Sequence, residues 1–219
     1  MGYLGAKGGS GVYQAIINVM PPHDTYIEAF LGTGVVMKNK APAMRNIGVD
    51  LNPGCIDGFD YAAELFQTNA LRFLSEFDYH ANGRVLVYCD PPYLHETRTS
   101  RTRYEHELSD EEHERLLNIL LSLPKNVSVI LSGYRNALYD RELPHWWSKD
   151  FQAMSRGGVR TETIWCNFLP SKIHFHTFAG ENNTDRQRIK RKAERWARNF
   201  EALPAYERQA VLSAILSTE

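Results

Sequence analysis

The feature of this sequence that most constrains its fold is an apolar strand pattern that ends in a stiff polar turn. Residues 85–89, Val-Leu-Val-Tyr-Cys, are typical of a strand that is covered on both faces. The turn after it consists of Asp90, Pro91, Pro92 and Tyr93. Proline has a fixed φ and no N–H, so the backbone after Asp90 cannot extend the sheet.

Such a turn offers a carboxylate, a proline carbonyl and a flat ring at the carboxyl end of a strand, where open α/β sheets bind ligands. These groups suit a planar molecule that carries an amine, with two acceptors for its N–H bonds and a ring to stack on. The alternative is a strand that simply ends in a proline turn, with Tyr93 packed at its rim.

A second ligand-type turn is expected earlier in the chain. Residues 25–30 read as a strand, and Gly32 and Gly34 follow before a helix that begins near Val35. Residues 46–50 read as the next strand and end in Asp50, which is placed to accept hydrogen bonds from ribose hydroxyls. A dinucleotide site would need a third glycine, and the chain has Met37 there. A tight turn with a solvated aspartate is the alternative interpretation.

Composition sets wide bounds. With 219 residues, 43% hydrophobic and 23% charged, the chain is expected to form one globular core. Its net charge of −1 means that any nucleic-acid surface must be local. Three cysteines without a Cys-x-x-Cys pair suggest reduced thiols in a cytoplasmic protein, and neither a signal peptide nor a membrane span is expected.

The Asp-Pro-Pro-Tyr turn and the Phe-x-Gly-x-Gly loop resemble those of the DNA adenine-N6 methyltransferases of the Dam-like, D12 class. The resemblance implies an α/β fold: a Rossmann-like S-adenosylmethionine-dependent methyltransferase sheet with antiparallel closing strands and a helical C-terminal extension. It implies S-adenosyl-L-methionine as the cofactor, and catalysis by Asp90, Pro91, Pro92 and Tyr93. The implied cofactor-binding residues are Tyr3, Lys7, Phe30, Gly32, Thr33, Gly34, Asp50, Asn69 and Asp90. Asn69 stands where the family commonly has an aspartate, and a turn or helix cap is its other interpretation.

Nucleic-acid contacts are expected from three places. The loop after Tyr93 carries Arg98, Arg101 and Arg103, and Tyr134 follows a strand at residues 127–131 and is a candidate pocket wall. A cationic helix over residues 185–199 has Ile189, Ala193, Trp196, Phe200 and Leu203 on one apolar face. Its candidate contacts are Arg188, Lys190, Arg191, Lys192 and Arg195. Solvated charged surfaces and plain packing remain the alternatives for these groups.

Other elements follow from local patterns. A helix is expected over residues 12–19, another around residues 55–65, and a short strand at 66–68. A capping box at Ser109 predicts a helix whose Leu116, Leu117, Leu120 and Leu121 face the core. Period-two alternation predicts antiparallel strands at 161–168 and 173–178, and Pro204 restarts a last helix with Val211, Leu212, Ile215 and Leu216 on its apolar side. His174 and His176 share one strand face without further ligands, so no metal site is predicted.

These expectations assemble into a catalytic domain at residues 1–180 and a basic helical extension at 181–219 packed on it. The predicted reaction is methyl transfer to N6 of adenine in duplex DNA after the base is flipped out. Few residues separate Asp50 from Asp90, so the large recognition insert usual in such enzymes is missing, and residues 144–160 join the candidates for recognition. RNA as substrate and a non-catalytic nucleic-acid-binding subunit stay open, whereas a nicotinamide oxidoreductase is disfavoured. A monomer or homodimer is expected.

Overall fold

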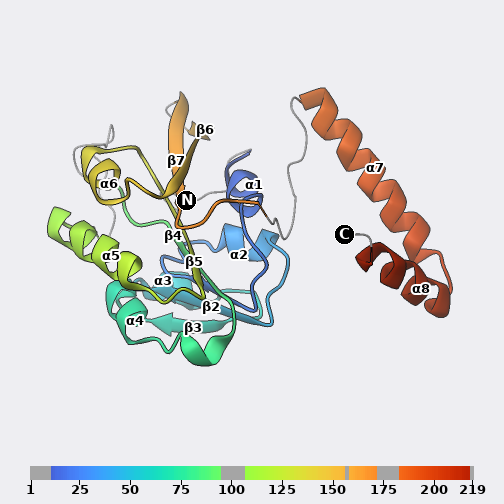
Figure 1. Cartoon of the computed structure of the whole chain (residues 1–219), viewed down its shortest axis with the longest axis horizontal. Coiled ribbons are helices and arrows are strands. Elements are labelled where there is room, and N and C mark those ends of the chain that lie inside the picture. The colour runs from blue at the N-terminus through green and yellow to red at the C-terminus, as the bar shows by residue number, and fades with distance from the viewer. Residues whose placement is uncertain (1–10, 95–106, 156–157, 172–182, 218–219) are drawn as a thin grey trace. The chain divides into compact units, whose positions relative to one another are not determined.

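The computed structural model describes residues 11–94, 107–155, 158–171 and 183–217. The chain divides into two compact units, residues 1–177 and 178–219. The first unit holds a seven-stranded sheet with helices on both sides, and Figure 1 labels most of its elements. The strands are β1 Thr25–Glu28, β2 Arg45–Asp50, β3 Glu64–Gln67, β4 Val85–Cys89, β5 Val127–Gly133, β6 Trp147–Ser155 and β7 Gly158–Cys166.

The strand order is β3-β2-β1-β4-β5-β7-β6. β1 to β5 run parallel, and β7 pairs antiparallel with both β5 and β6. The chain builds outward from β1 through β2 to β3 and then returns to place β4 on the other side of β1. The carboxyl ends of β1 and β4 therefore form a topological switch point, where open α/β sheets bind their ligands.

Helices of the first unit cover both faces of this sheet. They are α1 Val12–Ile17, α2 Val35–Asn39, α3 Pro53–Ile56, α4 Ala70–Glu76, the 3₁₀ turn η1 His80–Asn82, α5 Asp110–Ser122 and α6 Ala137–Glu142. Val87 packs in the core under α4 and α5, whereas Leu86 and Tyr88 pack in the core under α1 and α2. All five residues of β4 are buried, which confirms the predicted strand covered on both faces.

The α5 helix begins as predicted. Ser109 Oγ accepts from the Glu112 backbone N–H, and Glu112 Oε2 accepts from the Ser109 N–H, which completes the capping box. Three of the four expected leucines, at 116, 117 and 120, are buried. Leu121 is 47% exposed, so its assignment to the core was wrong.

Two other predictions need correction. The helix expected around residues 55–65 ends at Ile56, and β3 already begins at Glu64. Gly58, with a φ of 81°, turns the chain between them. The sheet edge is formed by β6 beside β7, so residues 147–155 form a strand that was not predicted. The strand expected at 173–178, with His174 and His176, lies outside the described residues.

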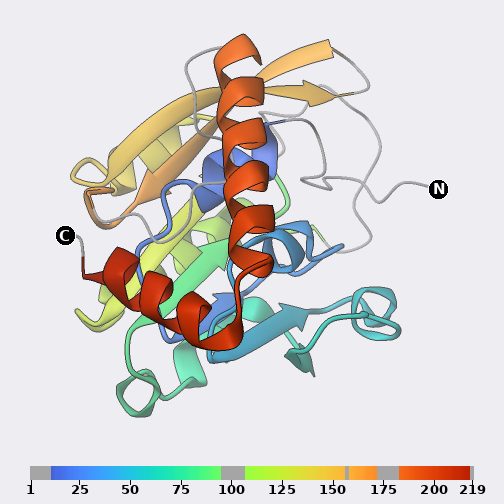
Figure 2. The same cartoon turned by 90° about the vertical axis from the view of Figure 1, so that its right-hand side faces the viewer.

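The second unit contains α7 Asn183–Glu201 and α8 Ala205–Leu216 (Figure 2). Both helices lie where the sequence predicts them. Ile189, Phe200 and Leu203 are half-buried on the expected apolar face of α7, but Trp196 is 60% exposed. On α8, Leu212 and Ile215 are also exposed.

Candidate active site

The Asp-Pro-Pro-Tyr turn lies at the switch point. The backbone N–H of Ala29, just after β1, donates to the carbonyl of Tyr88 in β4 at 3.0 Å, so the two strand ends adjoin. Pro91 is buried, and Asp90, Pro92 and Tyr93 are partly exposed. The rigid turn therefore places one carboxylate and one aromatic ring beside the loop that follows β1.

The Asp90 carboxylate is held from the neighbouring strand β5. Ser132 Oγ donates to Asp90 Oδ1 at 2.9 Å, and the Tyr88 hydroxyl lies 2.9 Å from the same Ser132 Oγ. Ser132 was not among the predicted site residues. Its sequence signal is the Ser-x-Tyr spacing of Ser132 and Tyr134 at the expected strand end, which resembles a pocket-lining element of the family.

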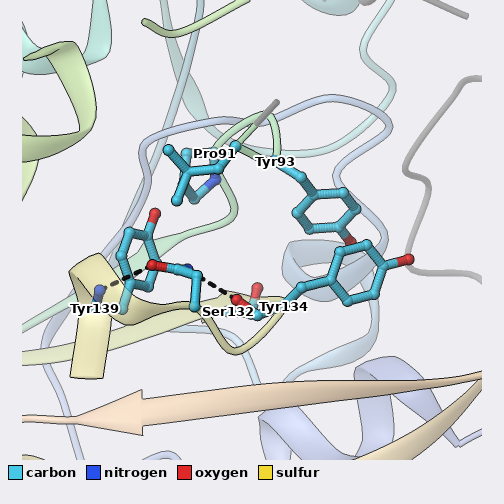
Figure 3. A pocket seen from close by; sticks show the side chains of 7 residues that line it. Pro91, Tyr93, Ser132, Tyr134 and Tyr139 are labelled. Carbon is cyan, nitrogen blue, oxygen red and sulfur yellow. Dashed lines mark hydrogen bonds between the residues drawn. The ribbon is translucent and has the colours of Figure 1, made fainter. Parts of the chain in front are cut away.

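A small pocket opens beside this turn (Figure 3). It contains about 200 Å³ of space, part of it open solvent. Its lining comes from the turn, the end of β5 and the start of α6: Pro91, Tyr93, Leu94, Ser132, Tyr134, Asn136 and Tyr139. Asn136 shapes its rim, because its side chain accepts from the Tyr139 N–H at 2.8 Å and donates to the Tyr134 carbonyl at 2.9 Å.

Tyr93 and Tyr134 form an aromatic pair at the mouth of this pocket. Their ring centroids are 4.4 Å apart, with 39° between the ring planes. The structure thus brings the two predicted tyrosines together. Two residues of β7 hold them: Tyr93 Oη donates to Glu162 Oε1 at 3.3 Å, and Arg160 Nη1 donates to Tyr134 Oη at 2.9 Å. The bond to Tyr134 raises the pKa of Arg160.

The sequence analysis also omitted Arg160 and Glu162 from the candidate site. They stand two positions apart, so they point to the same side of β7. The pairing of Gly133 with Thr163 brings that side next to Tyr134. Residues 160–167 have the pattern Arg-x-Glu-x-x-Trp-x-Asn, which also resembles the D12 class. This pattern is the sequence signal that points to Arg160 and Glu162.

The glycine loop between β1 and α2 is bonded to the Asp50 carboxylate at the end of β2. The Gly32 N–H donates to Asp50 Oδ2 at 2.8 Å, and the Asn52 N–H donates to Asp50 Oδ1 at 2.9 Å. Gly32 and Gly34 have φ values of 52° and 60°, the left-handed region that favours glycine. Asp50 is therefore a fixed, partly exposed carboxylate at the carboxyl end of β2.

Glu28, the last residue of β1, connects the two elements on either side of the glycine loop. This fully buried carboxyl group accepts from the Tyr26 hydroxyl and from the Met37 N–H, each at 3.0 Å. Burial raises the pKa of Glu28 to about 8. Burial likewise lowers the pKa of the nearby Lys40 to about 8.

Asn69 is the N-cap of α4. Its Oδ1 accepts from the backbone N–H groups of Leu71 and Arg72, at 2.9 and 3.2 Å. The cap interpretation is thus confirmed. Any contact with the cofactor would have to share this oxygen or use the amide nitrogen.

The structure does not test the remaining candidates. Tyr3, Lys7, Arg98, Arg101 and Arg103 lie outside the described residues. The five cations of α7 belong to the second unit. In the described ranges, no group of three or more His, Cys, Asp or Glu side chains could hold a metal ion, and no helix is long and apolar enough to span a membrane.

The sequence around this site is similar to a known protein family. Residues 59–161 match the family described as D12 class N6 adenine-specific DNA methyltransferase. Over these residues the chain is similar to that family. The match spans β3, β4, the Asp-Pro-Pro-Tyr turn and β5, and it reaches into β7. It confirms the predicted family, methyl transfer as the reaction, and S-adenosylmethionine as the methyl donor.

Solved structures with a similar fold include a SAM-dependent methyltransferase from Agrobacterium tumefaciens, at 14% identity and a TM-score of 0.47, covering 73% of this chain and 60% of that one. An rRNA methylase from Streptococcus thermophilus has 9% identity and a TM-score of 0.45, covering 72% and 93%. The N-methyltransferase NodS from Bradyrhizobium japonicum has 10% identity and a TM-score of 0.44, covering 71% and 93%. None of the curated protein sequences compared with this chain matches it.

Proposed function

We propose that this protein is a site-specific DNA methyltransferase that transfers the methyl group of S-adenosylmethionine directly to N6 of a flipped-out adenine. The supporting observation is the position of the Asp-Pro-Pro-Tyr turn. It lies at the switch point of the sheet, next to the glycine loop and at the mouth of a pocket with two tyrosines. The match to the D12 class family over residues 59–161 supports adenine in DNA as the substrate.

The residues around the glycine loop fit the cofactor. Gly32, Thr33 and Gly34 let the backbone pass close to a ligand, and each oxygen of Asp50 can accept a further bond from a ribose hydroxyl beyond the one that it already accepts. Phe30 is half-exposed at the end of β1 and offers an apolar surface. Tyr3, Lys7 and Asn69 complete the proposed cofactor site, with Asp90 at its border with the substrate pocket.

When bound, the cofactor supplies an electrophilic methyl group. The amine of adenine is a poor nucleophile because its lone pair is delocalised into the ring. Asp90 and the carbonyl of Pro91 would accept its two N–H bonds and so turn the lone pair out of the ring plane, while Tyr93 stacks on the base. Asp90 and Pro91 would hold the amine in this orientation while it takes the methyl group that the cofactor would supply, and the amine would then lose one proton to solvent.

A base inside a duplex cannot reach this pocket, so it must leave the stack. The proposed nucleic-acid contacts are Tyr134 at the pocket, the arginines after Tyr93, and the cationic face of α7. Arg160 joins them as a cation at the mouth of the pocket. The third α/β unit uses the residues between Asp50 and Asp90, so no room is left there for a recognition insert. Sequence recognition would therefore fall to these segments, to residues 144–160 or to a second subunit.

The first experiment measures transfer of a labelled methyl group from S-adenosylmethionine to unmethylated duplex DNA, with structured RNA in parallel. We expect label in DNA, recovered as N6-methyladenine after digestion. Label as N4-methylcytosine or in RNA alone would contradict the proposed substrate. No label in either nucleic acid, with the cofactor still bound, would point to a binding subunit.

The matched variant is Asp90→Ala. We expect it to reduce transfer by at least about 1000-fold, because it removes an acceptor that acts in the transition state. Cofactor affinity, measured by calorimetry, should change far less. Retained turnover in this variant would rule out the proposed mechanism.

A further inference from the structure

The Asp90 side chain can rotate in ways that its proline turn does not restrain. Pro91 and Pro92 stiffen the backbone after it, but the carboxylate can still rotate about χ2, a torsion that is intrinsically broad. The acceptor in the proposed reaction must point at a particular N–H bond. Something outside the turn must therefore set its orientation.

Ser132 provides that restraint from the adjacent strand. The parallel pairing of β4 and β5 sets Tyr88 opposite Ile130 and Cys89 opposite Leu131, so the next positions along the two strands adjoin. Ser132 is fully buried, and its hydroxyl donates to Asp90 Oδ1 at 2.9 Å. This bond connects residues that are 42 positions apart in the sequence.

The direction of the next bond follows from counting protons. A serine hydroxyl has a single proton, and Ser132 uses it toward Asp90. The Tyr88 hydroxyl, 2.9 Å from Ser132 Oγ, must then be the donor in that contact. Tyr88 is 1% exposed. The two bonds form a chain from Tyr88 through Ser132 to Asp90, and the first bond strengthens the second by polarising the serine.

We propose that Ser132, with Tyr88 behind it, is a positioning residue for methyl transfer: it fixes the plane of the Asp90 carboxylate so that one oxygen faces the amine. The proposal rests on the proposed function and adds to it a specific oriented pair behind the catalytic aspartate. Ser132 itself transfers no proton. Its contribution is geometric, and small misplacements of a reacting group are costly in rate.

The test compares single-turnover methyl transfer by the wild type with transfer by Ser132→Ala, Ser132→Cys and Tyr88→Phe. Removing the hydroxyl should slow transfer by about 10- to 100-fold. Ser132→Cys should be slowed similarly because a thiol fills the space but is a weak donor. Tyr88→Phe should lose less, about 3- to 10-fold, because Ser132 can still donate. Adding Tyr88→Phe to Ser132→Ala should have no further effect, since Tyr88 acts through Ser132.

Two readouts separate positioning from a merely structural role. The dissociation constant of S-adenosylhomocysteine should stay within about twofold of wild type in all variants, as for bonds that matter only in the transition state. Fluorescence of 2-aminopurine at the target position should also be unchanged, because this base lacks the 6-amino group that Asp90 would bind. Ser128→Ala, on the same strand, is the matched control and should transfer at the wild-type rate.

Equal transfer rates in the wild type and Ser132→Ala would overturn this inference and leave the proposed function intact. A parallel loss of cofactor affinity and base flipping would assign Ser132 a structural role and overturn it as well. If Ser132→Ala does not fold, Ser132→Cys and Tyr88→Phe replace it in the test. Wild-type transfer rates in both of these variants would then overturn the inference. If the wild type transfers no methyl group to DNA or RNA, the proposed function fails, and this inference fails with it.

Discussion

Gly34 is the residue in the glycine loop at which backbone conformation and space exclude a side chain together. Its φ is 60°, and an added Cβ would lie 2.3 Å from Phe59 Cε2 and 3.2 Å from Leu31 Cδ1. We expect Gly34→Ala to lower the free energy of unfolding by about 2–4 kcal/mol, the sum of left-handed strain and overpacking. Because the loop must shift, affinity for S-adenosylhomocysteine should also fall. Urea unfolding and calorimetry measure the two effects.

Gly58 provides the control for this prediction. Its φ is 81°, but nothing lies within 4 Å of an added Cβ. Gly58→Ala should therefore show only the backbone strain, about 1–2 kcal/mol, with cofactor affinity unchanged. Equal effects at the two glycines would mean that contact with Phe59 does not set the shape of the loop.

The buried Glu28 predicts a pH dependence of stability. Its pKa is about 8 in the folded protein, against an ordinary value of 4.5. Between these values the folded state binds more protons than the unfolded state, so this group's contribution to stability is full at low pH and is lost as pH rises toward 8. Glu28→Gln keeps an acceptor for Tyr26 and Met37 but removes the titration.

The stability of the wild type relative to Glu28→Gln should therefore fall between pH 5 and 7.5, by up to about 3 kcal/mol. Urea unfolding at several pH values measures this difference. Lys40 stays charged over most of this window, because its lowered pKa is about 8. The exposed control Glu76→Gln should show no such trend, and a flat difference for Glu28→Gln would contradict the prediction.

At the scale of single residues, the sequence indicates the residues of the proposed reaction but not the residues that hold them in place. Asp90 and Tyr93 could be singled out because their neighbours in the chain are unusual. Ser132, Arg160 and Glu162 could not, because they reach the site through strand pairing. Glu162 meets Tyr93 across 69 positions, and the register of β5 and β7 that brings them together depends on the whole sheet.

At the scale of elements, local signals worked where one motif sets a boundary. The Ser109 capping box predicted the start of α5, and it is present with both bonds. We expect Ser109→Ala to lower the free energy of unfolding by about 1 kcal/mol, because it leaves the Glu112 N–H without its cap. Ser75→Ala removes an exposed serine that only bonds within its own helix turn, and it should cost less than about 0.5 kcal/mol. Urea unfolding compares the two, and equal losses would show that the cap contributes little.

Local sequence patterns gave wrong predictions where the same residues are compatible with a helix and with a strand. Residues 55–65 contain enough apolar side chains for a helix, yet Leu65 lies in β3 and pairs with Gly48. That pairing is a tertiary effect, and it overrides helical preference. The β6 strand was missed for the same reason. Its residues alternate only weakly in polarity, and what makes them a strand is the long antiparallel pairing with β7.

At the scale of the whole molecule, the charge distribution is uneven. The net charge is −1, yet one side of α7 carries Arg188, Arg191, Lys192, Arg195 and Arg198. Their spacing of three and four residues places them along a single stripe about 15 Å long, opposite Ile189 and Phe200. All five are exposed. Arg188 also forms an ion pair with Asp185, with 2.7 Å between Nη2 and Oδ1. A stripe of this length could contact several phosphates of one DNA strand.

If α7 binds the DNA backbone, removing Arg195 and Arg198 together should weaken binding and make it less sensitive to salt. Each lost phosphate contact reduces the slope of log affinity against log salt by about 0.9, so the double alanine variant should lose about 1.8. Removing Arg115 and Lys125, exposed cations of the first unit, is the matched control because it changes the net charge equally. A general effect of charge would flatten both slopes alike, and that result would exclude a phosphate-binding role for α7. A change confined to the α7 variant, with the methylated sequence unaltered, would assign this helix to affinity and leave sequence recognition to the segments near the pocket.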